Sequence, residues 1–374
     1  MFHHADDELF VRPAELADLS ALLSLEQACF DSDRLSRRSF RHFILDQRSD
    51  IQLLVKQRTI AGYFLVLYRR GTSLARLYSL AVLPSERKQG YAQKLLNAAE
   101  AVARQRRCVF LRLEVRFDNR AAIQLYRTQG YQDFDVKHDF YEDHSDALCM
   151  QKRVYFFDAS AARPLVGYIQ QSTSFTCGPA SLLMAMNYFE PNQHHPYLEE
   201  LEIWREATTI FMTSGHGGCG PRGLALAAYK RGFAVQVLLN QDGPLFVDSV
   251  RTQEKKSILE WVYQVELQKV EQAGISVQIQ DFSLTELLRW LNDGYLVLIL
   301  ISTWQFDRSK APHWVLLCDA DDHFVYLNDP DVDTEQGRTA AEYQYIPVSL
   351  AVFQKAFSYG KQRLKAAVAL KKHN

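Results

Sequence analysis

The sequence lacks several features that would place the protein in a specialised class. No apolar run approaches the roughly 18 residues needed to cross a bilayer, and the run at 296–301 has the length of a buried strand. The N-terminal stretch MFHHADDELF contains neither the basic nor the apolar segment of a secretory signal peptide. The formal net charge is only -1, so bulk charge indicates neither a nucleic acid nor a membrane as partner.

Cysteine is present without the spacing of a metal or disulfide framework. No CxxC pair occurs among the six cysteines, which stand at positions 29, 108, 149, 177, 219 and 318. The stretch His216–Pro221 offers two potential ligands, too few for zinc, and is interpreted as a glycine-rich loop near a cleft. His194 and His195 are assigned to a surface loop. We therefore expect no metal and a reducing, cytoplasmic setting.

Length and composition predict two folded domains. A chain of 374 residues corresponds to two or three domains at roughly 100–200 residues each. Apolar residues make up 47% and charged residues 23%, which excludes global disorder. A small-residue stretch with a proline at 158–164 resembles a linker. The expected domains are therefore 1–157 and 163–374.

Hydrophobic periodicity predicts a mixed α/β organisation in the first domain and an α+β organisation in the second. In the first, helices are expected at 16–30, 91–107 and 121–129, and strands at 51–55, 62–68, 74–83, 108–115, 131–140 and 147–154. In the second, helices are expected at 178–189, 224–231 and 284–292, and strands of one antiparallel sheet at 296–301, 314–319 and 324–327. Residues 240–280 are interpreted as a mostly helical insertion, and the basic tail after Gly360 as a helix-prone, solvated end.

An anion site is predicted where a strand runs through a loop into a helix, in the segment LAVLPSERKQGYA. Gly90 and the small Ala92 allow a ligand to approach the backbone closely. Free N–H groups and the dipole of the following helix favour an anion there, and Arg87 and Lys88 add positive charge. Because no GxxxxGK[ST] motif is present, the pattern indicates a phosphate or pyrophosphate site without a Walker lysine. A basic turn ahead of a surface helix remains the plainer alternative.

A second motif, LEVRFDNRAAIQLYRTQGY at 113–131, follows the first along the chain. Together the two motifs resemble the GNAT acetyltransferase superfamily, and most closely its branch of ribosomal-protein alanine N-acetyltransferases. The resemblance covers about residues 8–155 and implies a mixed, twisted sheet with flanking helices. It also implies acetyl-CoA as the donor and a primary amine, such as a peptide or protein N-terminus, as the acceptor.

The resemblance assigns the donor site and two catalytic roles. The donor would lie against the backbone of Leu80, Ala81 and Val82, against Asn119 near its thioester, and along the pyrophosphate loop formed by Arg87, Lys88, Gln89, Gly90, Tyr91, Ala92 and Gln93. Tyr126 would contact the donor and protonate the leaving thiolate, and Glu114 would deprotonate the incoming amine through water. The segment KHDFYEDHSDALCM resembles the acceptor-binding strand of the same branch, with Tyr141 lining the slot. As alternatives, Glu114 is a surface charge and Tyr126 a core aromatic residue.

A nucleophilic cysteine is predicted in the segment QSTSFTCGPAS. Cys177 stands at the start of an expected helix, where a helix N-terminus favours the thiolate. Gln171 lies six residues upstream, the offset at which, in papain-like folds, a glutamine amide and the backbone N–H of the cysteine form an oxyanion hole. His313 begins a strand, and Asp329 follows the next strand after a short turn. The two strands bring this histidine and carboxylate together as a base and its orienting group.

The order Gln, Cys, His, Asp resembles the papain-like cysteine peptidases that cleave bacteriocin leader peptides. The resemblance covers roughly 163–335 and implies a cysteine-bearing helix packed on an antiparallel sheet. The preferred hypothesis is a bifunctional enzyme that acetylates an amine and hydrolyses a peptide or amide bond. In the alternatives, the cysteine domain only binds a peptide, or bound acetyl-CoA regulates it.

Overall fold

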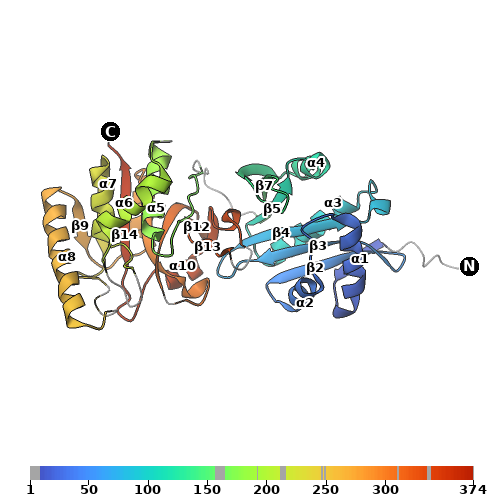
Figure 1. Cartoon of the computed structure of the whole chain (residues 1–374), viewed down its shortest axis with the longest axis horizontal. Coiled ribbons are helices and arrows are strands. Elements are labelled where there is room, and N and C mark those ends of the chain that lie inside the picture. Colours follow the sequence, from blue (N-terminus) through green and yellow to red (C-terminus); the bar gives the residue numbers. More distant parts are fainter. Residues whose placement is uncertain are drawn as a thin grey trace, which may run out of the picture. The chain divides into compact units, whose positions relative to one another are not determined.

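The computed structural model describes residues 9–155, 165–191, 193–210, 216–245, 247, 250–309, 311–334 and 338–373. The chain forms two compact units, Met1–Asp158 and Ala159–Asn374, each with its own sheet (Figure 1). The expected linker at 158–164 lies outside the described residues, so the domain limits 1–157 and 163–374 stay a prediction. No helix in the described ranges has both the length and the apolar character needed to cross a membrane.

The first unit is built on a seven-stranded sheet in the order β1-β2-β3-β4-β5-β7-β6. Its strands are β1 (Leu9–Pro13), β2 (Ser49–Lys56), β3 (Thr59–Tyr68), β4 (Leu74–Val82), β5 (Phe110–Arg116), β6 (Gln132–Lys137) and β7 (Ala147–Arg153). Neighbouring strands are antiparallel except β4 and β5, which are parallel. A parallel pair needs a crossover connection, and the helix after β4 provides it.

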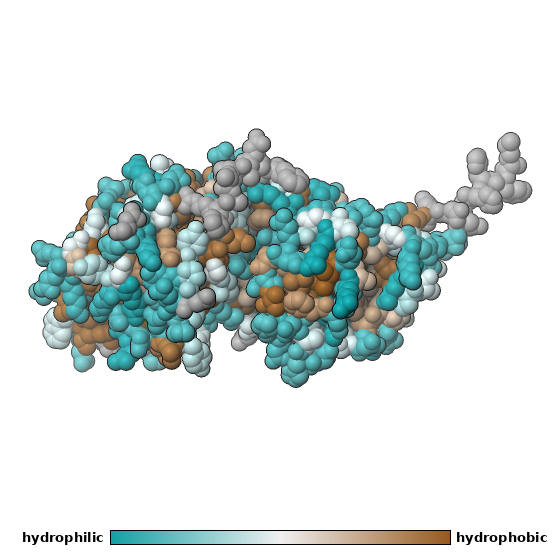
Figure 2. Space-filling model, turned by 90° about the horizontal axis from the view of Figure 1, so that it is seen from above, coloured by the Kyte–Doolittle hydropathy of each residue, from teal (hydrophilic) through white to brown (hydrophobic). Residues whose placement is uncertain are grey.

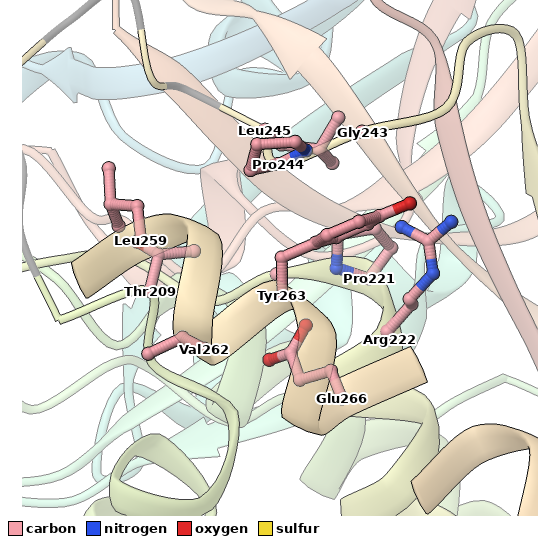
Figure 3. A pocket seen from close by; sticks show the side chains of 11 residues that line it. Thr209, Pro221, Arg222, Gly243, Pro244, Leu245, Leu259, Val262, Tyr263 and Glu266 are labelled. Atoms are coloured by element: carbon pink, nitrogen blue, oxygen red, sulfur yellow. The ribbon is translucent and has the colours of Figure 1, made fainter. Parts of the chain in front are cut away.

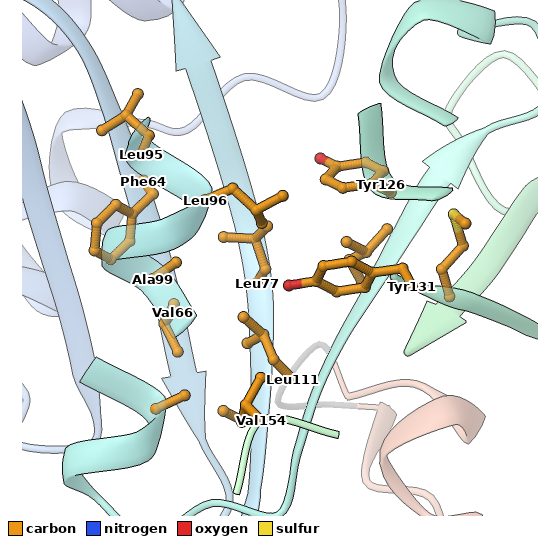
Figure 4. Packing of buried hydrophobic residues seen from close by; sticks show 14 of the residues in the cluster. Phe64, Val66, Leu77, Leu95, Leu96, Ala99, Leu111, Tyr126, Tyr131 and Val154 are labelled. Carbon is orange, nitrogen blue, oxygen red and sulfur yellow. The ribbon is translucent and has the colours of Figure 1, made fainter. Parts of the chain in front are cut away.

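Helices cover both faces of this sheet. They are α1 (Leu19–Cys29), α2 (Arg37–Leu45), α3 (Tyr91–Gln105) and α4 (Arg120–Thr128). In α3, Leu95, Leu96 and Ala99 are fully buried at helical spacing and pack against β3, β4 and β5 (Figure 4). The opposite face of the sheet packs against α1 and α2. The expected mixed α/β sheet with flanking helices is confirmed.

The second unit is built on a seven-stranded sheet in the order β13-β12-β11-β10-β14-β8-β9. Its strands are β8 (Phe233–Leu239), β9 (Ser276–Ile279), β10 (Leu296–Ser302), β11 (Pro312–Ala320), β12 (Phe324–Asn328), β13 (Ile346–Ser349) and β14 (Ala366–Lys372). Its helices are α5 (Cys177–Phe189), α6 (Pro196–Ala207), α7 (Pro221–Lys230), α8 (Gln253–Gln272), α9 (Leu284–Asn292) and α10 (Leu350–Ala356). The expected second sheet carrying the cysteine helix is confirmed, and only β8 and β9 pair in parallel.

Helices pack on both faces of this second sheet. On β10, alternate residues Val297, Ile299 and Ile301 belong to one core with α9 and α10. Residues alternate between the two faces of a strand, so the intervening leucines face the side on which α5 and α7 pack (Figure 1). The first residue of α5, Cys177, is thereby held over the middle of a rigid sheet.

The tail after Gly360 is not the solvated, helix-prone end that its composition suggests. Residues Ala366–Lys372 form β14, which pairs with β10 on one side and β8 on the other. All residues from Ala366 to Leu370 are fully buried. Alanine and lysine favour helices, but burial of a short, continuous apolar run between two strands overrides that propensity.

Two further expectations about the second unit are corrected. The insertion expected at 240–280 contains the helix α8, but its end, Ser276–Ile279, is the strand β9 of the main sheet. His194 is not a surface residue, because its side chain is only 10% exposed and lies between Glu190 and Glu199. The short helix α6 that follows it creates this environment.

Hydrophilic side chains cover most of the face shown in Figure 2, and apolar side chains interrupt them in patches. The largest exposed apolar residues among those described include Tyr197, Leu198 and Trp261. Exposed apolar residues of this kind are common on folded proteins, so they do not by themselves indicate a partner.

Candidate active sites

An opening between β4 and β5 is the main feature of the first unit. The two strands pair only where Leu74–Arg76 lies beside Phe110–Arg112. A β-bulge in β4 leaves Tyr78 without a partner residue in β3. Beyond it, β4 continues to Val82 paired with β3 and no longer with β5. The backbone edge of Leu80–Val82 that faces β5 is therefore available to an extended ligand.

A loop with unusual backbone angles follows β4 and leads into α3. Lys88 has φ 64° and Gly90 has φ 78°, both in the left-handed region. No described side chain caps the first turn of α3, and no described atom lies within 4 Å of a Cβ built on Gly90. Uncapped N–H groups, an open approach and exposed Lys88 form a donor set that fits a pyrophosphate.

Neighbouring residues of this loop are held by local contacts. Arg87 Nε donates to the carbonyl oxygen of Val82 at 3.3 Å. The amide of Gln89 donates to Glu86 at 3.0 Å, and Glu86 also pairs with Lys56 at 2.9 Å. These contacts fix the loop backbone and leave its N–H groups at the start of α3 turned toward solvent.

Tyr126 lies on α4 beside the core of the first unit. It is 8% exposed, and its ring centroid is 5.6 Å from that of Tyr131. Figure 4 shows its ring directed toward Leu96 of α3. Burial raises the pKa of Tyr126 to about 12, so the phenol stays protonated at neutral pH. It therefore packs against the core and also retains a proton to donate.

Asn119 stands at the start of α4 and acts as its N-cap. Its Oδ1 atom accepts a hydrogen bond from the backbone N–H of Ala122 at 3.1 Å. The structure gives Asn119 this structural contact, while its predicted contact with the donor stays a prediction.

Glu114 lies on β5 just beyond the last residue paired with β4. Its carboxylate accepts from Arg76 Nε at 2.8 Å and from Lys137 Nζ at 3.2 Å. Its side chain is only 5% exposed, so it is not the surface charge offered as an alternative. The two cations favour the ionised Glu114 carboxylate. They therefore oppose the protonation that this carboxylate would undergo as a base.

Two loops of the first unit meet near Glu114. The backbone N–H of Glu142 donates to Asp33 Oδ1 at 3.4 Å, which joins the loop after α1 to the loop after β6. Tyr141 is half-buried there, and Arg116 lies 5.3 Å from its ring centroid. Burial, followed by the charge of Glu114, raises the pKa of Tyr141. Tyr141 thus lies beside the predicted base.

A buried network behind this slot was missed in the sequence. Glu26 accepts from the backbone N–H of Leu35 at 2.8 Å and from the Tyr63 hydroxyl at 2.6 Å. Tyr63 also shares a hydrogen bond of 2.7 Å with Ser79, beside the bulge in β4. Burial raises the pKa of Glu26. The position of Glu26 could have indicated its burial. It directly follows Leu25 and lies on the buried face of α1.

In the second unit, Cys177 is the first residue of α5. It is a free thiol with 8% exposure. Thr176 is the N-cap but makes no capping hydrogen bond among the described residues. The free backbone N–H groups at the start of α5 therefore have no side-chain cap among the described residues.

His313 and Asp329 meet at the end of β11 and just after β12. His313 Nε2 and Asp329 Oδ1 are 2.7 Å apart, and both side chains are largely buried. Burial lowers the pKa of His313, but Asp329 and then Cys177 outweigh it and raise that pKa well above its ordinary value. Since Cys177 is one of the groups that raise this pKa, the thiol lies near the imidazole that the carboxylate holds.

Gln171 lies near the same groups but is held by a residue that sequence reasoning missed. Its Nε2 atom donates to Asp331 Oδ1 at 2.8 Å, and its backbone N–H donates to Pro330 at 3.0 Å. Its Oε1 atom is buried without a hydrogen-bond partner in the described ranges. An amide nitrogen has two hydrogens, so one remains for an oxyanion. Its role there stays a prediction.

The glycine-rich segment His216–Pro221 lies against the start of α5. A Cβ built on Gly178 would be 3.2 Å from Cys219 Cβ, which places the segment beside the helix that begins at Cys177. Burial, then Cys177, raises the pKa of Cys219. The ring of His216 packs with Phe175 and Trp204, with ring centroids 4.8 and 5.7 Å away. The sequence placed this loop near a cleft but did not identify its aromatic partners.

Comparisons with known proteins agree with two different domains. The Acetyltransferase (GNAT) family model matches residues 19–131, and the Peptidase_C39 like family model matches 166–371. The catalytic subunit of the N-terminal acetyltransferase A complex, NAA10, of Arabidopsis thaliana is 33% identical over 152 residues, covering 38% of this chain and 77% of that protein. A putative ribosomal protein bS18-alanine N-acetyltransferase of Bacillus subtilis is 28% identical over 142 residues, covering 37% of this chain and 92% of that protein.

Among solved structures, the ribosomal-protein-S18-alanine N-acetyltransferase of Escherichia coli aligns with 42% of this chain and 100% of its own at 24% identity and a TM-score of 0.38. These relatives cover the first unit alone, and acetyl-CoA is the donor of the GNAT family. The second unit accounts for more than half of the chain's length and matches its family model nearly throughout. The chain therefore belongs to the Peptidase_C39 like family and carries a GNAT N-acetyltransferase domain ahead of that unit.

Proposed function

We propose that the protein is a bifunctional enzyme. Its N-acetyltransferase domain modifies a peptide or protein N-terminus, and its cysteine unit hydrolyses a peptide or amide bond. The proposal rests on one arrangement in each unit: the opening between β4 and β5 beside Tyr126, and the meeting of Cys177, His313 and Asp329.

Acetyl transfer needs a held donor, a neutral amine and a proton for the leaving group. Bound acetyl-CoA supplies an acetyl group as a thioester. The loop at Lys88–Gly90 would bind its pyrophosphate, and Leu80–Val82 would lie along its extended arm. Tyr126, which is protonated at neutral pH, would then return a proton to the sulfur.

The amine proton leaves on the opposite side of the opening. A protonated amine has no lone pair for attack, so a base must take its proton as the new C–N bond forms and the C–S bond breaks. We assign this proton to Glu114 through water, with the ion pair to Lys137 loosening as the carboxylate accepts it. Tyr141 would line the slot beside it. The acceptor assignment draws on NAA10, which is named as a subunit of an N-terminal acetyltransferase, and on the putative bS18-alanine N-acetyltransferase, which is named for an alanine of a ribosomal protein.

Hydrolysis in the second unit would proceed through an acyl-thioenzyme. His313 would take the Cys177 thiol proton to give a thiolate–imidazolium pair. The sulfur would then attack the carbonyl carbon, and the imidazolium would give its proton to the leaving amine as the C–N bond breaks. Asp329 would stabilise the imidazolium at 2.7 Å. The backbone N–H of Cys177 and the second amide hydrogen of Gln171 would bind the oxyanion. Water would release the acid and regenerate the thiol.

The two activities can be tested on one protein with matched variants. The full chain and its Tyr126→Phe and Cys177→Ala forms are incubated with acetyl-CoA and N-terminally free peptides, and products are followed by mass spectrometry. Tyr126→Phe should lose acetylation and keep cleavage, and Cys177→Ala should do the reverse. Acetylation with no cleavage in any form would instead favour a cysteine unit that only binds peptides or responds to acetyl-CoA.

A further inference from the structure

A small cavity of about 30 Å³ lies between the start of α7 and one face of α8 (Figure 3). Four residues of α8 line it at helical spacing: Leu259, Val262, Tyr263 and Glu266. Gly220, Pro221 and Arg222 at the start of α7 form the facing wall, with Gly243–Leu245 and Thr209 at the rim. The cavity has room for the polar end of a side chain or small molecule.

The cavity is distinct from the cysteine site but shares a wall with it. Cys219 packs against Gly178 of the nucleophile's helix. Its neighbour Gly220 lies on the cavity side, where a Cβ would be 3.8 and 3.9 Å from the two oxygens of Glu266. The segment Cys219–Gly220 therefore separates the cavity from Cys177, and neither Cys177, His313 nor Asp329 lines it.

Arg222 provides an unused hydrogen-bond donor in this cavity. Its side chain is 2% exposed and is fixed by an ion pair of 2.8 Å with Asp242. The Tyr263 hydroxyl donates to the same Asp242 oxygen at 2.7 Å, and its ring lies 5.0 Å from the guanidinium carbon. Arg222 Nε is buried without a hydrogen-bond partner among the described residues. A buried donor of this kind requires an acceptor.

Glu266 provides the complementary acceptor. It faces the cavity from α8 and has no hydrogen bond or ion pair with any other residue that the structure describes. Burial raises its pKa to about 7, opposed by Arg222 and then Lys269. Because Asp242 already neutralises Arg222, an anionic ligand would meet the uncompensated charge of Glu266. A cationic ammonium group has no acceptor atom, so it would leave Arg222 Nε–H without a hydrogen-bond partner.

A neutral carboxamide satisfies both groups at once. Its carbonyl oxygen accepts from Arg222 Nε–H, and its NH₂ group donates to the Glu266 carboxylate. The apolar walls would contact the alkyl part of the ligand through Pro221, Pro244, Leu245, Leu259 and Val262.

We propose that the cavity between α7 and α8 binds the carboxamide of an asparagine or glutamine side chain or of a small free amide, held between Arg222 and Glu266. This site requires no chemistry at Cys177, so it stands whether or not the cysteine unit hydrolyses a bond.

Ligand-observed NMR on the full chain tests this site with propionamide and propionate as probes. Propionamide should bind saturably at pH 8 and at least about tenfold more tightly than propionate, since the acid places its charge beside Glu266. Blocked tripeptides carrying glutamine or norleucine distinguish the source of the amide. Preferential binding of the glutamine peptide identifies a side chain, and binding of propionamide alone identifies a free amide.

Variants locate the binding. Glu266→Leu should weaken propionamide binding about tenfold, through loss of a charge-assisted hydrogen bond. The matched change Glu271→Leu, on an exposed position of the same helix, should leave it unchanged. Val262→Trp fills the cavity without touching its polar groups and should abolish binding. The proposal would be overturned if the unmodified protein showed no saturable binding. It would also be overturned if Glu266→Leu and Val262→Trp both bound propionamide as tightly as the unmodified protein.

The pH dependence supplies an independent readout. As the pH rises from 6 to 8, Glu266 loses its proton and becomes a better acceptor, so propionamide should bind more tightly and propionate less tightly. The charged and titratable groups around it are Arg222, Asp242, Tyr263, Lys269 and Cys219. Equal or tighter binding of propionate at pH 8 would contradict a carboxamide site.

Discussion

In the proposed mechanism, individual residues carry the chemistry of each unit, and Tyr126 gives the clearest test in the first. Tyr126→Phe removes the hydroxyl and keeps the ring that packs against Tyr131. We expect kcat for acetyl transfer to fall about 100-fold, the scale of a lost general acid, with little change in KM for acetyl-CoA. Steady-state kinetics at fixed peptide concentration measures both values. An unchanged kcat would leave Tyr126 as a core aromatic residue alone.

The ion pairs of Glu114 give a second test at this scale. Lys137→Met removes one of the two cations that hold the carboxylate ionised. If Glu114 is the base, the acidic limb of the kcat/KM profile moves to higher pH, because less positive charge then opposes protonation. Lys94→Met, on the exposed surface of α3, is the matched control. An acidic limb that stays in place would indicate that another group accepts the amine proton.

In the second unit, the test concerns the partner of His313. Asp329→Ala removes both the charge and the acceptor 2.7 Å from Nε2, whereas Asp329→Asn keeps an acceptor oxygen. Cleavage should fall about 100-fold in the alanine variant and less in the asparagine variant. Rates measured on one cleaved peptide make this comparison. Equal losses in the two variants would contradict an orienting role.

The raised pKa of His313 also predicts a pH dependence of stability. Because the folded pKa lies above the unfolded value of about 6.5, the stabilisation is complete below that value and is lost as the pH rises through the folded pKa. The difference in urea midpoint between the unmodified protein and Asp329→Ala should therefore shrink at high pH. If this difference in urea midpoint instead grew as the pH rose, it would contradict a raised pKa for His313 in the folded protein.

Residue types and spacing were enough to predict that His313 and Asp329 lie side by side, but not what surrounds them. A helix start, a strand start and a strand end place Cys177, His313 and Asp329 close together once the strands pair. The ion pairs of Glu114 and the link between Gln171 and Asp331 depend on side-chain directions that no local pattern encodes. Glu26 was overlooked for the same reason.

At the scale of elements, the start of α3 depends on one glycine. Gly90 has φ 78° with open space at its missing Cβ, so Gly90→Ala adds backbone strain without a clash. We expect a loss of about 1 kcal/mol in stability and a higher KM for acetyl-CoA. Gly167→Ala, with open space and no left-handed angle, is the control. Thermal unfolding and acetylation kinetics give the two readouts, and a normal KM would argue against a donor site at this loop.

Elements with clear periodicity were predicted closely, as α9 and β4 show, and those shaped by tertiary burial were not. The strand β14 combines alanine and lysine, which favour helix, with a central place in the sheet. The strand β9 follows a long helix after a two-residue turn and is too short for period-two alternation to be seen. The helix α6 begins at Pro196. Proline is common at the first position of a helix, but it is also common in loops, so it did not by itself predict this helix.

At the scale of the whole molecule, the two units have separate sheets and separate cores. Each catalytic group lies within one unit, so each activity should survive the loss of the other. The double variant Tyr126→Phe with Cys177→Ala should lose both activities and retain the urea midpoint of the parent within error.

The most direct test of this account is a single product analysis of a proteome-derived peptide library with free N-termini, incubated with acetyl-CoA and the full chain. The account predicts acetylated and cleaved peptides from the unmodified protein, only cleaved peptides from Tyr126→Phe, and only acetylated peptides from Cys177→Ala. Cleavage that persists in Cys177→Ala, or acetylation that persists undiminished in Tyr126→Phe, would contradict it.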